Sequence, residues 1–311
     1  PIPMSTPFIS FIIPTYNTPS ALLRQCIESI LAINLAENER QIILVDDNSK
    51  QPALEAVKKY AAHITYLRFA QNKGQAAARN AALAQATGTY IQFIDADDTL
   101  FPQRYNYVLQ ALRHSASQQP DVLVFNFSRD AAADSSSSIT WSAPITGIHY
   151  LCHHNMRAAC WGYVFKRELL NNLHFIEGNM HEDEDFTPRA IIRAHTLCFT
   201  TTPIYYYRLR ANSISNSPAP SHLLRKLADK EQILLNLAND HWTSAEQPAI
   251  TRRLHQLTAD LLYNVWTYTH SLRKLRQTIL RLHQHSLCPL PLNFYSPRYW
   301  AWVLALKCIG A

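Results

Sequence analysis

The first 128 residues alternate apolar, strand-like segments with helical segments, and this rhythm limits the possible folds more than any other feature. Strands are expected at residues 8–13, 42–45, 64–69, 90–94 and 121–127. Such alternation predicts an α/β fold, in which helices flank a mostly parallel sheet. Ligands of these folds bind beyond the carboxyl ends of the strands, so the loops there are the first place to look for a site.

Helices are expected between these strands. Thr18 and Pro19 supply an N-cap and a first helical residue, and an apolar stripe at three- and four-residue spacing follows them. Further helices are predicted at residues 54–61, 74–86 and 105–112, and a later aromatic strand at residues 203–209. The stripe of the first helix consists of Leu22, Leu23, Cys26, Ile27, Ile30 and Leu31.

Polar loops follow four of the predicted strands, and a parallel sheet brings them to one rim. Together they have the residue types of a nucleotide pocket. The four loops are Pro14-Thr15-Tyr16-Asn17, Asp46-Asp47-Asn48-Ser49, Asn72-Lys73-Gly74 and Asp95-Ala96-Asp97-Asp98.

The last of these loops places three carboxylates within four residues. Alternate residues of an extended chain share a face, so Asp95 and Asp97 point the same way while Asp98 turns into the following loop. Carboxylate oxygens suit Mg²⁺ or Mn²⁺, and Mg²⁺ is commonly held by one or two carboxylates and the phosphates of a substrate. The triplet predicts a metal and phosphate site, and the alternative is a solvated acidic turn.

The other loops offer groups for the nucleoside and its phosphates. Asp46 or Asp47 can accept the imino N–H of a pyrimidine, and Tyr16 can stack on the base. Arg79 lies in the first turns of the helix that Gly74 opens, where positive charge favours phosphate. Alternatives remain, because the aspartates can cap the next helix, Tyr16 can be packing, and Arg79 can form a surface ion pair.

In order along residues 9 to 215, these motifs resemble the inverting glycosyltransferases of the large bacterial family 2, which have the GT-A fold. The resemblance implies that the first-strand loop, Asp46, Asp47, Asn72, Gly74 and Arg79 form the nucleoside site. It implies that Asp95-Ala96-Asp97 holds the metal and the diphosphate. The motifs are Ile12-Ile13-Pro14-Thr15-Tyr16-Asn17, Val45-Asp46-Asp47-Asn48-Ser49, Asn72-Lys73-Gly74, Ala78-Arg79-Asn80, Phe93-Ile94-Asp95-Ala96-Asp97-Asp98, Trp161-Gly162-Tyr163-Val164-Phe165-Lys166-Arg167-Glu168-Leu169 and His181-Glu182-Asp183-Glu184-Asp185-Phe186.

The second acidic cluster, residues 182–185, lies at the start of a predicted helix, where negative charge is favourable. The resemblance implies that Asp183 is the general base and that Glu182 orients it or an acceptor hydroxyl. A base is needed because the acceptor hydroxyl loses its proton as it attacks the anomeric carbon. Glu184 and Asp185 are expected to face solvent.

The resemblance implies a single in-line displacement with inversion at the anomeric carbon. Trp161 and Gly162 are candidates for the acceptor platform, and core packing is the alternative for Trp161. In similar proteins a Tyr-Arg segment with a downstream serine closes over the diphosphate, and here Arg208, Arg210 and Ser213 match it. Surface charge is the alternative for the two arginines.

The sequence divides into a predicted catalytic domain, residues 1–215, and a basic helical region, residues 221–311, joined by a Ser- and Pro-rich linker. Residues 247–311 hold eight Lys or Arg and one acid, a net +7 against +6 for the whole chain. This charge suits anionic lipid or a phosphate-bearing acceptor, and nothing else indicates nucleic acid. Residues 294–307 are aromatic and apolar and predict either an interfacial helix or a core helix docked on the catalytic domain.

Composition agrees with an enzyme in the cytoplasm, peripheral on the inner face of the membrane if the tail binds lipid. Six cysteines without paired spacing suggest reduced thiols, and no signal peptide or transmembrane run is evident. The expected partners are a nucleotide-sugar, a UDP-sugar above all, and a glycan or lipid-linked acceptor in surface polysaccharide or lipopolysaccharide assembly. Two rivals stay open. A nucleotidyltransferase would want a glycine-rich phosphate loop, and a non-catalytic nucleotide-sugar sensor would keep the donor pocket and lose the base.

Overall fold

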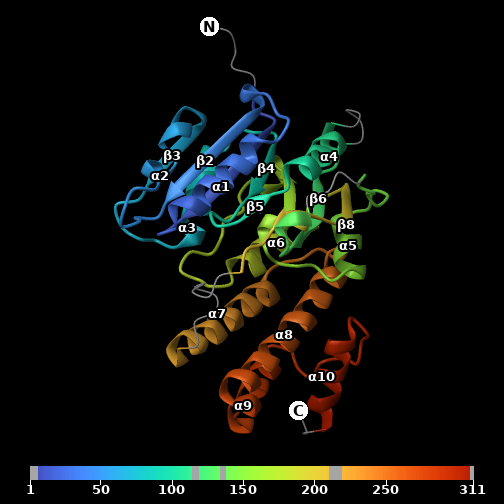
Figure 1. Ribbon diagram of the computed structural model, residues 1–311. Helices are drawn as coiled ribbons and strands as arrows, with labels where there is room; N and C mark the ends of the chain where they lie inside the picture. The colour runs from blue at the N-terminus through green and yellow to red at the C-terminus, as the bar shows by residue number, and fades with distance from the viewer. Residues whose placement is uncertain (1–5, 114–118, 134–137, 210–218, 309–311) are drawn as a thin grey trace.

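A computed structural model describes residues 6–113, 119–133, 138–209 and 219–308. Within them the centre of the fold is an eight-stranded sheet of order β3-β2-β1-β4-β7-β6-β8-β5 (Figure 1). The strands are β1 Ile9–Thr15, β2 Arg40–Asp46, β3 Ile64–Arg68, β4 Tyr90–Phe93, β5 Thr99–Leu100, β6 Val122–Ser128, β7 Tyr163–Lys166 and β8 Leu197–Tyr206.

The pairing confirms the predicted α/β fold with a mostly parallel sheet. Strand β1 runs parallel to β2 and β4, β2 runs parallel to β3, and β6 runs parallel to β8. The antiparallel pairs are β7 with β4 and with β6, and β5 with β8. Because β1 to β4 share one direction, their carboxyl ends form a common rim.

Helices flank both faces of this sheet (Figure 1). The α-helices of the sheet region are α1 Ser20–Leu31, α2 Ala53–Ala56, α3 Gln75–Gln85, α4 Pro102–Arg113, α5 Gly147–His153 and α6 Glu182–Ile192. Short 3₁₀ helices are η1 Glu37–Glu39, η2 Lys58–His63, η3 Ala131–Ala133, η4 Cys160–Gly162 and η5 Arg167–Leu170.

Three local predictions were wrong. Pro19 itself is the N-cap of α1, so Thr18 is not. The helix expected at residues 54–61 is split, because Val57 leaves the helical region at φ −122° and separates α2 from η2. Strand β8 begins at Leu197, six residues before the predicted start, because its first half pairs in parallel with the buried strand β6.

Two apolar clusters cover the two faces of the sheet. Successive side chains of a strand point to opposite faces, so Phe11 and Ile13 join one cluster while Ile12 joins the other. The first cluster includes the buried stripe of α1, namely Leu23, Cys26, Ile27 and Ile30. The predicted stripe is thus confirmed at these four positions, while Leu22 and Leu31 are only half-buried.

Four further helices follow the sheet: α7 Pro220–Asn239, α8 Gln247–Thr269, α9 Leu272–Gln284 and α10 Pro297–Cys308. Helix α7 packs on α6 and α8 packs on α5, and residues such as Ile250 and Leu257 belong to the same apolar cluster as Ile12. The predicted linker falls almost entirely within residues 210–218, outside the described residues. The division into residues 1–215 and 221–311 stays a prediction.

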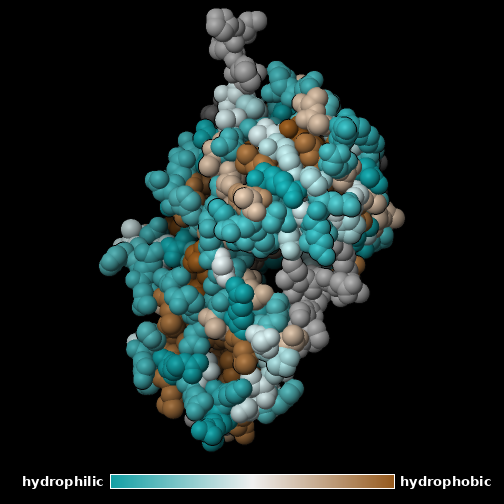
Figure 2. All heavy atoms as spheres, turned by 90° about the vertical axis from the view of Figure 1, so that its left-hand side faces the viewer, coloured by the Kyte–Doolittle hydropathy of each residue, from teal (hydrophilic) through white to brown (hydrophobic). Residues whose placement is uncertain are grey.

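Helix α10 lies against α8 along one side only. Tyr299, Val303 and Leu306 are buried, whereas Trp300 and Leu304 remain 41% and 39% exposed. On the face in Figure 2, hydrophobic side chains reach the surface among hydrophilic ones over the lower, C-terminal half. Among the helices described, none is both long and apolar enough to cross a membrane.

Candidate active site

The four predicted loops meet at the carboxyl rim of β1 to β4 and are joined by hydrogen bonds. The backbone N–H of Asn17 donates to Ser49 Oγ at 2.9 Å, and that of Asp47 donates to Thr15 O at 2.9 Å. The side chain of Gln75 donates to Asp95 Oδ1 at 3.0 Å, which connects the third loop to the fourth. The prediction that the four loops lie at one rim of the sheet is therefore confirmed.

The two aspartates after β2 hold the backbone of the rim. Asp46 is fully buried, and its carboxylate accepts from the N–H groups of Ser49 and Ala53, at 2.8 and 2.9 Å, and from Tyr66 and Arg68. Asp46 therefore caps the next helix, which was the alternative prediction for it, because Ala53 begins α2. Asp47 accepts from Lys73 N at 2.6 Å and Gly74 N at 2.8 Å and so shapes the third loop.

Backbone conformation adds to this shaping at three positions. Asn17 and Asn48 adopt left-handed φ values of 50° and 62°, which asparagine tolerates better than most residues. Gly74 has φ 92°, a value that glycine adopts without a steric penalty. Tyr16, beside Asn17, is 46% exposed, so its ring is not core packing and is open to a stacking partner.

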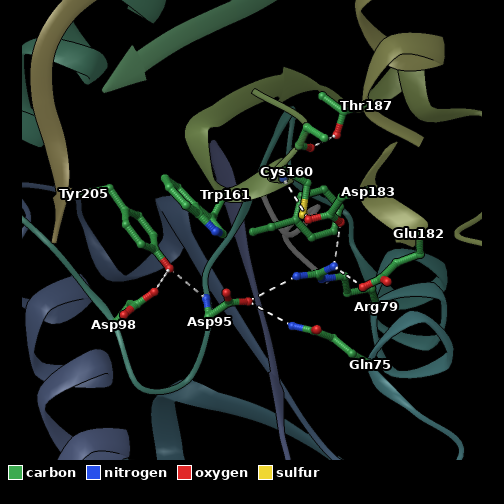
Figure 3. Close-up of polar contacts among 12 residues, drawn as sticks. Gln75, Arg79, Asp95, Asp98, Cys160, Trp161, Glu182, Asp183, Thr187 and Tyr205 are labelled. Atoms are coloured by element: carbon green, nitrogen blue, oxygen red, sulfur yellow. Dashed lines mark hydrogen bonds and ion pairs between the residues drawn. The ribbon is translucent and has the colours of Figure 1, made fainter. Parts of the chain in front are cut away.

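Arg79 lies at the centre of the site and is only 2% exposed (Figure 3). Its guanidinium donates to Asp183 Oδ1 at 2.7 Å, to Glu182 Oε1 at 2.9 Å and to Asp95 Oδ1 at 3.1 Å. The alternative that Arg79 forms a surface ion pair is wrong, because its guanidinium is buried. One cation thus links the acidic loop after β4 to the start of α6, although 103 residues separate Arg79 from Glu182.

Asp183 is a partly exposed member of this cluster, as is Asp95, whose side chain is 24% exposed. The side chain of Asp183 is 20% exposed, and its second oxygen, Oδ2, lies 3.3 Å from the backbone nitrogen of Cys160 in η4. Arg79 and Cys160 together fix the orientation of the carboxylate at the rim. A carboxylate held in this way can accept a proton from a hydroxyl that lies within hydrogen-bond distance of it.

The crowding of carboxylates changes their acidity. Burial, and next the charge of Asp183, raise the pKa of Glu182 to about 7, against the opposing effect of Arg79. Burial also raises the pKa of Asp95 to about 6, with Asp97 and Asp183 adding to the shift and Arg79 opposing it. The site therefore favours added positive charge, which a divalent cation can supply.

The three aspartates after β4 fit a metal site only in part. Burial, and next the charge of Asp95, raise the pKa of Asp98 to about 8. Its oxygens accept from Tyr205 Oη at 2.9 Å and from the backbone N–H of Arg208 at 2.7 Å, so both are taken up by protein donors. Among the described residues no three His, Cys, Asp or Glu side chains form a ready metal cage. Asp97 and Asp95 remain as the pair that suits a cation shared with substrate phosphates.

Arg208 lies beside this loop. Its Nε donates to the backbone oxygen of Asp97 at 3.1 Å, and its terminal nitrogen donates to Gln25 Oε1 at 2.8 Å. Arg208 therefore lies at the rim next to the predicted diphosphate position. Arg210 and Ser213, predicted with it, lie outside the described residues.

Two acidic residues next to Asp183 do not face solvent, so that prediction was wrong. Glu184 pairs with Arg253 of α8, and its side chain is 18% exposed. Asp185 is 4% exposed and pairs with Arg189 at 3.0 Å. Helices α7 and α8 cover this end of α6, which composition alone does not show.

The Glu184–Arg253 pair predicts an acid-sensitive contribution to stability. Burial acts to raise the pKa of Glu184, but Arg253 and then Lys230 and His181 lower it below its ordinary value. A lowered pKa gives stability that is present above the ordinary pKa and is lost as the pH falls through the folded-state value. We expect Glu184→Gln to lower the free energy of unfolding by about 1–3 kcal/mol at neutral pH.

Urea denaturation at neutral pH and below the ordinary glutamate pKa of about 4.3 checks this prediction. The difference from the wild type should shrink at the acidic pH. Exposed Glu37 serves for the control Glu37→Gln, which should change stability little. A difference that is the same at both pH values would contradict the role given to the Glu184 charge.

Trp161 packs rather than presenting a free ring face. It is 6% exposed and stacks on Tyr205, with ring centroids 4.4 Å apart and planes 14° apart. The core-packing alternative therefore describes Trp161. Gly162, next in the chain, lines a cavity of about 260 Å³ at the same rim.

A comparison with known families matches residues 10–173, more than half of the chain, to the family described as Glycosyl transferase family 2. The chain belongs to glycosyl transferase family 2. The matched residues carry all four rim loops and η4. The α6 acidic cluster follows the matched segment.

The sequence identity to individual relatives is low. The chain is 29% identical to EpsH of Bacillus subtilis over 226 residues, 68% of this chain and 63% of that protein. It is 28% identical to the glycosyltransferase GlyG of Streptococcus pneumoniae, over 66% of this chain and 72% of that protein. The match thus spans less than two thirds of EpsH.

Solved structures share the fold. S. aureus TarS in complex with UDP-GlcNAc superposes with a TM-score of 0.68 at 19% identity, covering 97% of this chain and 92% of that one. The mannosyltransferase PcManGT from Pyrobaculum calidifontis, in complex with GDP-Man and Mn²⁺, gives a TM-score of 0.56 at 17% identity, with 98% and 87% covered. These neighbours establish the GT-A arrangement of the family 2 chain, with its C-terminal helices.

Sequence reasoning missed several groups of the family 2 site. Gln75 directly follows the Gly74 loop, so its contact with Asp95 follows from its place at the first residue of α3. Tyr205 lies near the end of β8, and its hydroxyl both donates to Asp98 and accepts from Asp95 N at 3.0 Å. The Cys160 backbone contact with Asp183 leaves no signal in the sequence.

Proposed function

We propose that this chain is an inverting glycosyltransferase that moves a sugar from a nucleotide-diphosphate sugar to a hydroxyl of a glycan or glycolipid acceptor. One observation carries the proposal. Asp183, partly exposed, is held by the same buried guanidinium that holds Asp95 of the acidic loop. A proton acceptor thus lies beside the loop whose residue types suit a diphosphate and its metal.

Membership of family 2 supports transfer of a glycosyl group. A UDP-sugar is the proposed donor, since S. aureus TarS has the same fold and is seen with UDP-GlcNAc. Surface polysaccharide assembly is the proposed setting, and one relative, GgaB of Bacillus subtilis, is a minor teichoic acid biosynthesis protein. The inversion, the individual donor sugar and the acceptor belong to the proposal.

Different rim residues hold different parts of the donor. Exposed Tyr16 offers a ring for the base, and Arg208 lies next to Asp97, where its charge favours diphosphate oxygens. Asp97 and Asp95 would hold Mn²⁺ or Mg²⁺, which when bound offsets negative charge on the leaving diphosphate. Asp98 keeps this loop against β8 through Tyr205.

The acceptor side depends on Asp183. Its carboxylate takes the proton of the acceptor hydroxyl as that oxygen attacks the anomeric carbon from the face opposite the diphosphate. One bond forms and one breaks, so an α-linked donor gives a β-glycoside. Arg79 and the Cys160 N–H hold the base in place, and Glu182 shares Arg79 with it.

The two rival functions are less well supported. A nucleotidyltransferase needs a phosphate-cradling loop after the first strand, and Pro14-Thr15-Tyr16-Asn17 is not glycine-rich. A nucleotide-sugar sensor has no use for an oriented carboxylate at the rim. Contact of the C-terminal region with the inner face of a membrane stays a prediction, for which Trp300 and Leu304 are the exposed side chains.

Saturation-transfer NMR with a panel of nucleotide-sugars, with and without Mn²⁺, tests the donor site. We expect one donor to bind in a metal-dependent manner and Asp97→Ala to abolish that dependence, because the variant removes an oxygen ligand of the ion. Asp240→Ala, at an exposed aspartate beyond α7, is the matched control and should bind like the wild type. Folded wild-type protein that binds no donor would overturn the proposal.

A further inference from the structure

The cavity of about 260 Å³ beside Gly162 has no place in the donor site. It lies between the middle parts of β6 and β8 and the segment that leads into η4, and its polar lining includes Asn126, His154, Arg157 and Thr200. Binding sites for drug-sized ligands are typically about 300–1,000 Å³, so this cavity suits one small group, such as a glycerol phosphate or a single sugar ring.

Arg157 gives this cavity a positive charge without a carboxylate to balance it. Its guanidinium donates to Asn126 Oδ1 at 3.1 Å and lies 4.3 Å from the ring centroid of Phe127 and 5.7 Å from that of Trp161. None of the carboxylates in the described residues lies within ion-pair distance of it. An arginine has five N–H donors, and Arg157 is exposed, so a ligand can reach its guanidinium.

A second arginine, Arg252, adds positive charge next to the residues that line the cavity. Arg252 of α8 is 9% exposed and donates to Leu151 O at 3.1 Å, His154 O at 2.6 Å and Asn155 Oδ1 at 2.7 Å, all of which are uncharged. Burial, and then the neighbouring His149, His153 and Arg252, lower the pKa of His154. No residue that lines the cavity carries a carboxylate. The electrostatics therefore favour an anion.

The cavity and the proposed base both contact the short helix η4. Gly162 lines the cavity, and Cys160, two residues earlier, donates its N–H to Asp183 Oδ2. Consecutive Cα atoms are about 3.8 Å apart, so these two residues are separated by no more than about 7 Å. The cavity therefore borders the segment that orients the proposed base.

We propose that this cavity is an acceptor subsite for an anionic group, a phosphate or a carboxylate, which Arg157 binds. The inference rests on the proposed glycosyl transfer and narrows its acceptor to a charged molecule. Arg157 is a binding and specificity residue here, and Asp183 remains the base. The forked guanidinium matches two oxygens of either anion.

Saturation-transfer NMR with two pairs of probes tests the subsite. sn-Glycerol 3-phosphate is compared with glycerol, and methyl β-glucuronide with methyl β-glucoside, so that each anion has a neutral partner of similar shape. We expect one anion to bind at least about tenfold more tightly than its partner, and Arg157→Gln to remove that preference, since a charge-assisted hydrogen bond is lost. The pair that responds identifies phosphate or carboxylate as the group.

Arg273→Gln on α9 removes the same charge at an exposed position and should leave anion binding unchanged. Arg157→Lys should keep part of the preference, because it keeps the charge and loses the fork. Equal binding of anion and neutral partner by the wild type, or an unchanged preference in Arg157→Gln, would overturn the subsite. Nucleotide-sugar binding, recorded on the same samples, shows separately whether the donor site stands.

Discussion

Asp183→Asn is expected to lower the rate of sugar transfer by about 10²–10⁴-fold, the range found for loss of a general base. Asparagine keeps the shape of the side chain and a hydrogen-bond acceptor for Arg79, so the fold should persist. It cannot take the proton of the acceptor hydroxyl. The release of nucleoside diphosphate in the presence of an acceptor panel measures the rate.

Donor affinity is the internal control for this variant. Asp183 lies on the acceptor side of Arg79, so the dissociation constant of the nucleotide-sugar should stay within about twofold, far below the factor of ten that 1.4 kcal/mol represents. Asp240→Asn, at an exposed aspartate that pairs with Arg189 of α6, should keep the wild-type rate. Equal rates for the two variants would remove Asp183 from the mechanism.

The fold and the rim loops could be predicted from the sequence because they follow from short-range patterns. Runs such as Phe11-Ile12-Ile13 alternate between two apolar clusters, which only a strand covered on both faces requires. The positions of Asp47 and Asp95 then follow from the rule for the carboxyl ends of parallel strands. Neither inference needs contacts between distant parts of the chain.

Predictions about single side chains failed where a distant segment decides their surroundings. Asp185 was expected at the surface, yet it is buried, and α6 packs on α7 and is linked to α8 by the Glu184–Arg253 pair. Nothing near residue 185 in the sequence reveals that cover. The surface pair considered for Arg79 is also wrong, because its partners come from the loop after β4 and from α6, whereas its assignment to phosphate stays a prediction. Burial of a charge is a property of the tertiary fold, which local composition does not encode.

In the proposed mechanism, the Arg79 cluster keeps the donor side and the acceptor side adjacent. Asp95 comes from the loop that suits the donor phosphates and Asp183 from the helix that suits the acceptor, and one guanidinium holds both within 3.1 Å. A shift of either element changes the position of both carboxylates. Donor and acceptor geometry are thus set by a single buried residue, which touches neither the metal nor the hydroxyl in the proposed mechanism.

Arg79→Met is therefore expected to destabilise the protein by about 3–5 kcal/mol, the cost of removing one partner of a buried ion pair. Methionine fills much of the space, but Asp95, Glu182 and Asp183 are left facing one another without a cation. Their charges then repel, and transfer activity should fall with stability. Urea denaturation at several pH values measures the loss.

The pH dependence distinguishes lost charge from lost packing. Even beside Arg79, burial raises the pKa of Glu182 to about 7, and removal of the cation raises it further. A raised pKa gives stability that is present at low pH and is lost as the pH rises through the folded-state value. The deficit of Arg79→Met should therefore be largest above neutral pH and shrink in mild acid.

Arg113→Met is the matched control for this variant. Arg113 pairs with Glu39 at the surface, where its side chain is 44% exposed, and an exposed pair contributes about 0–1 kcal/mol. Its loss should be small at every pH. A deficit in Arg79→Met that stays constant between acid and alkaline pH would show that packing, and not the three carboxylates, makes Arg79 necessary.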